Sequence, residues 1–194
     1  MLTPPSAYAV DWVVGGNDIT SASSEFLGTK STSTDKDMEL HSGSVRVLKF
    51  DYNATSTSII GGYSGNTATT SVGVTIGGGG ASGSINQTTS DCDYCTIGGG
   101  VGNYIDHDWS TIGGGELHSI EADRATISGG SGNTIDGNNR GTIGGGFSNV
   151  INGATGSSTI AGGDRNKTYA SGYCSIGGGQ LNVIGVNDGS GIVE

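Results

Sequence analysis

The ten residues TIGGGELHSI, at positions 111–120, decide the fold of this chain because versions of them recur along most of its length. The shared pattern is Thr-Ile-Gly-Gly-Gly-x-x-Asn-x-Ile. Successive copies are spaced by 16, 21, 15, 15, 16, 17 and 16 residues. A repeat of this kind determines the whole architecture of a chain. The first isoleucine of each copy is Ile60, Ile76, Ile97, Ile112, Ile127, Ile143, Ile160 or Ile176.

A second apolar anchor follows the first isoleucine by eight residues in most copies. This second anchor is an isoleucine in five copies, namely Ile105, Ile120, Ile135, Ile151 and Ile184. In the other three copies the same position holds Ala68, Ser84 or Thr168. Small residues recur two positions before the first isoleucine, and the period of two places them inward beside it. Asparagine recurs two positions before the second anchor, where it can form a hydrogen-bonded ladder or adopt a left-handed turn conformation. The asparagines are Asn103, Asn133, Asn149, Asn166 and Asn182.

Glycine separates the two anchors and makes up 39 of the 194 residues, roughly three times the usual share of about 7%. Three consecutive glycines would break a helix, because each costs about 1 kcal/mol relative to alanine. Two runs that are too short for helices, each followed by a turn, can form one coil of a narrow solenoid. The sequence therefore predicts an all-β fold, a short-rung parallel β-solenoid or β-roll.

The thin core of such a coil predicts association. Two inward isoleucines per rung contribute about 3 to 5 kcal/mol, while ordering about 16 residues costs several times more. Three coils around a common axis would pool their isoleucine columns. We therefore expect a homotrimer with parallel chains in register.

The repeats over residues 57–186 resemble the glycine-rich TIGGGxxNxI segments of trimeric fibre proteins, including phage tail-fibre-like proteins and the β-roll heads of trimeric autotransporter adhesins. This resemblance implies a structural and adhesive fibre segment that presents a repeat surface to a receptor or glycan. The alternative is a purely structural, self-assembling filament or virion appendage subunit without ligand binding. Either role implies a virion appendage or a location outside the cell or at its surface.

The rest of the chain divides around the repeats. Residues 25–56 predict a small β-meander or hairpin, because the stretches 37–41 and 44–50 alternate in polarity around a Ser-Gly turn. Residues 1–24 predict an extended arm or linker, with disorder as the alternative. Residues 187–194 are expected to form a C-terminal tail.

Charge and composition narrow the function classes. With 8 Lys and Arg against 18 Asp and Glu, the net charge of −10 disfavours nucleic acid and anionic membranes. No run approaches the roughly 18 apolar residues of a membrane helix. No nucleophile-elbow or phosphate-loop motif is present, so we expect no enzyme and no cofactor. Glycan cleavage by carboxylates in a trimer groove remains the catalytic alternative.

A column three residues before the first isoleucine is the candidate contact surface. By parity it should face away from the core, and aromatic rings with guanidinium groups can bind sugars by stacking and polar contacts. The alternative is packing against a neighbouring subunit. The column comprises Tyr94, Trp109, Arg124, Arg140, Ser157 and Tyr173, and all except Ser157 form the candidate glycan patch.

Two further groups have structural interpretations. The stretch Asp106-His107-Asp108, with His118 in the next rung, is the densest set of potential metal ligands, but we expect a solvated corner and no metal. Cys95 and Cys174 belong to the small inward column and should fill the core, while a Cys92–Cys95 disulfide would staple a bulge in the 21-residue unit. Glycosylation sequons occur at Asn53, Asn86 and Asn166 and are attributed to chance.

Overall fold

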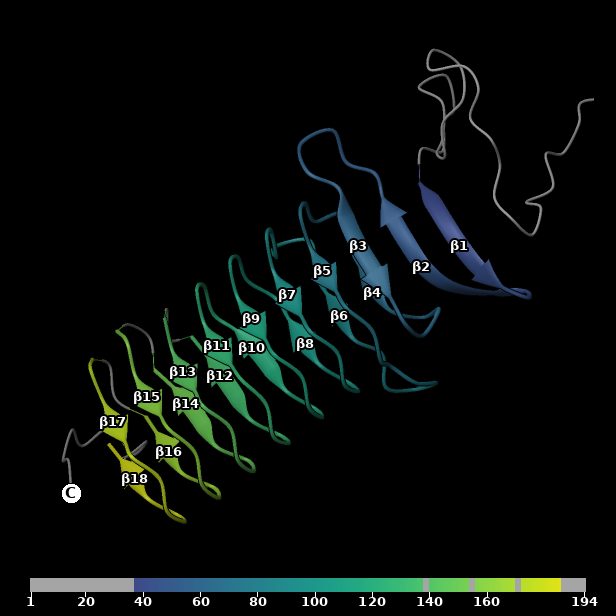
Figure 1. Ribbon diagram of the computed structural model, residues 1–194. Coiled ribbons are helices and arrows are strands. Elements are labelled where there is room, and N and C mark those ends of the chain that lie inside the picture. Colours follow the sequence, from purple (N-terminus) through teal and green to yellow (C-terminus); the bar gives the residue numbers. More distant parts are fainter. Residues whose placement is uncertain (1–36, 138–139, 154–155, 170–171, 186–194) are drawn as a thin grey trace, which may run out of the picture.

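The computed structural model describes residues 37–137, 140–153, 156–169 and 172–185, and every regular element in them is a β-strand. Most strands form two parallel sheets that run side by side along one axis, as Figure 1 shows. The predicted parallel β-solenoid is therefore confirmed. One sheet contains β1 (Met38–Ser42), β2 (Val45–Asp51), β3 (Ser58–Gly61), β5 (Thr75–Ile76), β7 (Thr96–Ile97), β9 (Thr111–Ile112), β11 (Thr126–Ile127), β13 (Thr142–Ile143), β15 (Thr159–Ile160) and β17 (Ser175–Ile176). The other contains β4 (Thr67–Ala68), β6 (Gln87–Thr88), β8 (Tyr104–Ile105), β10 (Ser119–Glu121), β12 (Thr134–Asp136), β14 (Val150–Asn152), β16 (Lys167–Thr168) and β18 (Val183–Ile184).

Each rung of the solenoid contributes one strand to each sheet, and the repeats stack in register. Ile127 is paired with Ile112 on one side and with Ile143 on the other. Backbone hydrogen bonds link the rungs; for example, the Thr111 amide donates to the Ala125 carbonyl at 2.9 Å. Because side chains alternate along a strand, the threonine of each Thr-Ile pair faces outward while the isoleucine faces the opposite sheet.

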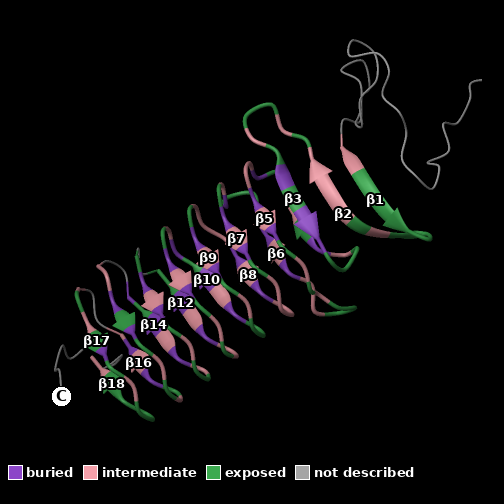
Figure 2. Cartoon of the chain, viewed as in Figure 1, coloured by how far each residue is buried: buried purple, intermediate pink, exposed green. Residues whose placement is uncertain are grey.

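The core consists of two isoleucine columns that face each other inside one chain. Ile97, Ile112 and Ile127 of one sheet and Ile105 and Ile120 of the other have no exposed surface. The buried strand positions run as an inner line along the solenoid in Figure 2. The chain thus covers its own isoleucines, with only Ile184 partly buried at the last described strand. The opposite sheet of the same chain buries both columns, so the isoleucines of three coils do not have to be pooled to cover them.

An asparagine ladder closes the core beside the second isoleucine column. The Asn103 side-chain Nδ2 donates to the Gly99 carbonyl at 2.9 Å and to the Gly115 carbonyl of the next rung at 3.1 Å. Its Oδ1 accepts the backbone N–H of His118 at 3.1 Å. The asparagines therefore form the hydrogen-bonded ladder and not left-handed turns. Two further asparagines that the sequence pattern did not include, Asn66 and Asn86, also belong to the ladder.

The third glycine of each triplet is required by close approach of the rungs. Gly130 has a φ of 96°, and a Cβ there would collide with the Gly146 backbone of the next rung and with the Asn133 side chain. The middle glycine is less constrained, because a Cβ on Gly129 would meet only the Gly114 carbonyl oxygen at 3.9 Å. The first position is closely packed as well, because a Cβ on Gly98 would collide with the Gly113 carbonyl oxygen of the next rung.

The long 21-residue unit has four extra residues between its first anchor, Ile76, and its second anchor. Thr88, not Ser84, is the buried second anchor, and it follows Ile76 by 12 residues instead of 8. A tight turn takes up the insertion, closed by reciprocal backbone hydrogen bonds between Ala81 and Ser84 at 3.0 and 3.1 Å. The corner with the Cys92–Cys95 disulfide is also longer than in the next rung, because Ile97 follows Thr88 by nine residues whereas Ile112 follows Ile105 by seven.

An antiparallel hairpin extends one sheet beyond the first rung. Strands β1 and β2 pair through Glu39 and Lys49, and Lys49 pairs with Ile60 of β3. Directly paired residues share a face, so Lys49 points to the core side, where Asp37 and Asp51 hold its ammonium at 2.8 and 3.0 Å. The expected arm at residues 1–24, the first part of the expected meander and the expected tail lie outside the described residues.

Candidate functional site

The candidate contact column lies on the corner that leads into the first strand of each rung. The backbone of Tyr94, Trp109, Arg124 and Arg140 is left-handed, with φ between 54° and 68°. Their amides donate to carbonyls of the preceding rung, as Trp109 does to Asp93 at 2.9 Å. The column therefore projects from a repeated turn and not from a strand, so strand parity was the wrong reason for expecting it to face outward.

All aromatic members of the column reach solvent. The exposed fractions are 47% for Tyr94, 48% for Trp109 and 89% for Tyr173. Arg124 and Arg140 are also exposed, whereas Ser157 is half-buried. The structure thus brings Tyr94, Trp109, Arg124 and Arg140 together on four consecutive rungs, and Tyr173 lies two rungs further on beyond Ser157.

The column is internally stacked. The Arg124 guanidinium carbon lies 4.5 Å from the centre of the Trp109 ring, which is a cation–π contact. Tyr94 similarly leans over Gly73 of the preceding rung, where an added Cβ would lie 2.7 Å from its Cδ1. One face of Trp109 is therefore covered by a cation, and an incoming sugar would meet that cation instead of an open ring face there.

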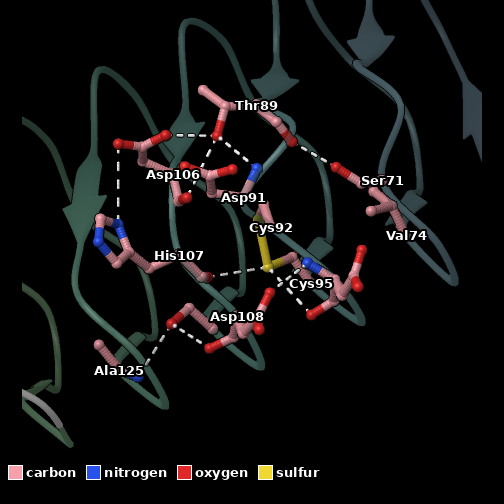
Figure 3. The surroundings of a disulfide bond; sticks show 12 residues. Ser71, Val74, Thr89, Asp91, Cys92, Cys95, Asp106, His107, Asp108 and Ala125 are labelled. Carbon is pink, nitrogen blue, oxygen red and sulfur yellow. Dashed lines mark hydrogen bonds and ion pairs between the residues drawn. A yellow bond between two sulfur atoms is a disulfide. The ribbon is translucent and has the colours of Figure 1, made fainter.

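Two carboxylates next to the column, those of Asp93 and Asp108, accept hydrogen bonds from backbone amides of the preceding rung. The Asp108 Oδ1 accepts the Asp93 amide at 2.6 Å, and the Asp93 Oδ1 accepts the Val72 amide at 2.9 Å. Asp106 instead accepts the Thr89 hydroxyl and lies 3.7 Å from the Nδ1 of His107, as Figure 3 shows. Asp93 and Asp108 thus fix the turns from which the column projects.

The possible metal ligands of the sequence do not converge. His118 is buried in the asparagine ladder, where it takes the place of an asparagine, while Asp106, His107 and Asp108 lie at the other end of the rung. Burial lowers the pKa of the His118 imidazole. In the described part of the chain, no three His, Cys, Asp or Glu residues lie close enough together to hold a metal ion. His118 cannot contact a ligand at the surface, because its ring is inside the core.

A disulfide joins Cys92 and Cys95 and encloses Tyr94 in its loop. Both cysteines are fully buried, and the Cys95 Sγ lies 3.1 Å from the His107 carbonyl oxygen (Figure 3). Cys95 occupies the inward column, so the bond anchors the first rung of the contact column to the core. Cys174 is free and half-buried.

Two of the glycosylation sequons fall inside the core. Asn86 and Asn166 belong to the buried ladder, and the Nδ2 of each donates to two glycine carbonyls. These amide nitrogens are not accessible for modification in the folded chain.

A second surface feature is an open groove of about 570 Å³ between the N-terminal hairpin and β4. Its lining includes Glu39, Lys49 and Asp51, and Arg46 spans it by donating to the carbonyls of Ser64 and Asn66 at 2.6 and 3.0 Å. Arg46 thereby hydrogen-bonds two backbone carbonyls just before β4, which is the first strand at this edge of the eight-stranded sheet. These charges are engaged with one another and with the backbone.

Comparison with protein-family models, with curated proteins and with solved structures gives no match for this chain. The described residues contain no helix that is long and apolar enough to cross a membrane. Functional inference therefore depends on the geometry of the solenoid and its contact column.

Proposed function

We propose that this chain is a structural and adhesive fibre segment, a rigid rod that attaches to a receptor or glycan through its contact column. The observation that carries the proposal is the exposure of Tyr94, Trp109, Arg124 and Arg140 on consecutive rungs of a continuously hydrogen-bonded solenoid. A fibre needs both properties, stiffness along its axis and a repeated contact surface.

Stiffness follows from the hydrogen bonding between rungs. Adjacent rungs are about 4.8 Å apart, and the eight rungs from β3/β4 to β17/β18 are joined by parallel pairing in both sheets. Each rung also contributes an asparagine or histidine to the buried ladder. Bending the rod would break bonds in both sheets and in the ladder.

The composition of the column favours recognition. Tryptophan, tyrosine and arginine dominate the energetics of protein interfaces because they combine large contact areas with directed polar groups. Here they gather on one corner of a chain whose net charge is −10. A partner that contacts this corner meets rings and cations on a rigid backbone.

The proposal also includes a homotrimer, not because the isoleucine core needs other chains but because several contact columns would act together. Three parallel chains would present three contact columns to one surface, and multivalency raises apparent affinity without new contacts. The mass of the native assembly by light scattering tests this element. A mass of 19.3 kDa, that of a single chain, would reject it.

The alternative, a purely structural filament, draws on a different surface. The outward positions of six consecutive rungs in the ten-stranded sheet are all threonine, which gives this face an uncharged stripe suited to lateral packing between copies. The threonines are Thr75, Thr96, Thr111, Thr126, Thr142 and Thr159. Filament growth that depends on this stripe, and no ligand binding by the contact column, would favour the alternative.

Attachment assays with matched aromatic variants test the proposal. Trp109→Ala should weaken attachment to target cells or to a glycan array at least tenfold while leaving the mass and Tm of the protein nearly unchanged. Phe147→Ala is the control, because Phe147 is 51% exposed but lies on the opposite corner. Full attachment by the Trp109 variant, or equal loss in both variants, would reject the contact column as the attachment surface.

A further inference from the structure

Two arginines of the contact column have no carboxylate partner among the described residues of this acidic chain. Arg124 contacts the Trp109 ring, and Arg140 has no ion pair or hydrogen bond from its side chain to any other residue that the structure describes. Arg165 behaves differently, since its Nε lies 2.9 Å from the Asp164 carboxylate. The chain contains 18 acidic residues, so the free guanidinium groups are not explained by a shortage of partners.

The two guanidinium groups project from adjacent rungs. Thr126 is paired with Thr142, and each arginine lies two residues before its threonine in the same left-handed turn. Their amides donate to the Asp108 and Asp123 carbonyls, both at 2.9 Å. Adjacent rungs are about 4.8 Å apart, so the backbone positions that carry these two like charges are neighbours on the same corner. An anion between them would relieve their repulsion.

We propose that Arg124 and Arg140 form a binding site for an acidic sugar, whose carboxylate or sulfate group lies between the two guanidinium forks. This inference rests on the proposed attachment function and names the ligand class of the same column. An arginine fork donates two parallel hydrogen bonds to an oxyanion. Trp109 stacks against Arg124 and so restricts the orientation of its guanidinium before the ligand arrives.

The surroundings select a glycan with separated charges over a dense polyanion. Asp108 and Asp123 immediately precede Trp109 and Arg124 in the chain, and the whole chain carries ten excess negative charges. These carboxylates repel a continuous row of phosphates, whereas one acidic group flanked by neutral hydroxyls meets only the arginine pair. The neutral hydroxyls of such a sugar can donate hydrogen bonds to the Asp108 and Asp123 carboxylates and contact the edge of the Trp109 ring.

Binding of a fluorescently labelled neutral oligosaccharide that carries one terminal glucuronate, measured by anisotropy, tests the site, with the methyl ester of that glucuronate as the uncharged comparator. The same oligosaccharide with one sulfate in place of the glucuronate is run in parallel to distinguish carboxylate from sulfate. Wild type should bind at least one acidic probe, and Arg124→Gln and Arg140→Gln should each reduce that affinity at least tenfold. Arg165→Gln should have no effect. Raising the salt concentration should also weaken binding.

The outcomes separate this inference from the proposed function. Equal affinity for the acid and its ester, or arginine variants that bind like wild type, would overturn the acidic-sugar site; Trp109-dependent attachment would then persist and the fibre role would stand. Failure of wild type to bind either acidic probe would also overturn the site. Attachment that is insensitive to Trp109→Ala would in addition reject the proposed function.

Discussion

Replacing His118 by asparagine should stabilise this protein, because histidine interrupts a ladder that asparagine completes. The His118 Nδ1 accepts the Asn133 amide at 3.1 Å, so the neutral ring carries its proton on Nε2. That nitrogen is buried and has no hydrogen-bond partner of good geometry among the described residues. In the neighbouring rungs, the Nδ2 groups of Asn103 and Asn133 each donate to two glycine carbonyls.

The magnitude follows from these hydrogen bonds. A buried unsatisfied donor costs about 1 to 3 kcal/mol, and each new hydrogen bond adds a net 0.5 to 1.5 kcal/mol or so. The smaller asparagine gives up packing against Gly115, which the His118 ring approaches closely, and this offsets part of the gain. We expect His118→Asn to raise the free energy of unfolding by about 2 kcal/mol, equivalent to a Tm increase of about 4 to 8 °C for a chain of this length.

Thermal melts followed by circular dichroism at pH 7.5 measure the effect. The reciprocal variant Asn133→His is the control, since it places the same unsatisfied ring one rung further along and should lower Tm by a similar amount. If His118→Asn melts at or below the wild-type temperature while Asn133→His is neutral, the ladder does not contribute to stability in the way argued here.

Three further expectations follow from the core. Because the pKa of His118 is lowered in the folded chain, the unfolded chain binds a proton first as pH falls below its value of about 6.5, and stability is lost until pH has passed the folded value. Wild type should therefore lose stability faster than His118→Asn in urea melts between pH 7.5 and 5. Ile112→Asp should destabilise the chain by at least about 4 kcal/mol, because it buries an unpaired carboxylate, and a wild-type Tm would show that this position is not core. Gly130→Ala should cost about 2 kcal/mol or more through its positive φ and the collision with Gly146, whereas Gly129→Ala should be nearly neutral in the same melt.

The architecture could be predicted from the sequence because the repeat encodes it redundantly. The Thr-Ile pair gives the inward and outward alternation of each strand, and the glycine triplets exclude helices. These signals recur in most rungs, so one substitution such as Thr168 for isoleucine does not hide the period. In the long unit, the second anchor was expected at Ser84 but lies at Thr88, because four extra residues precede it. Threonine is not strongly apolar, so the sequence pattern does not reveal this anchor.

The geometry of the contact column was less predictable. Exposure was expected from strand parity, but Trp109 projects from a left-handed turn whose form depends on hydrogen bonds to Asp93 of the preceding rung. The stacking of Arg124 on Trp109 depends on side-chain directions that a linear pattern does not contain. Core closure within one chain was not expected because two isoleucines per rung bury little apolar area, while the hydrogen bonds of the buried asparagines, which also close the core, are not visible in the sequence pattern.

Oxidative footprinting of Trp109, in the protein alone and after attachment to its target surface, tests the central claim most directly. The proposed attachment function predicts that Trp109 is readily oxidised in the free protein, in keeping with its 48% exposure, and becomes protected on attachment, while Phe147 on the opposite corner reacts equally in both states. Equal oxidation of Trp109 before and after attachment would contradict the account. So would protection of Trp109 in the protein alone, since its own copies would then cover the column.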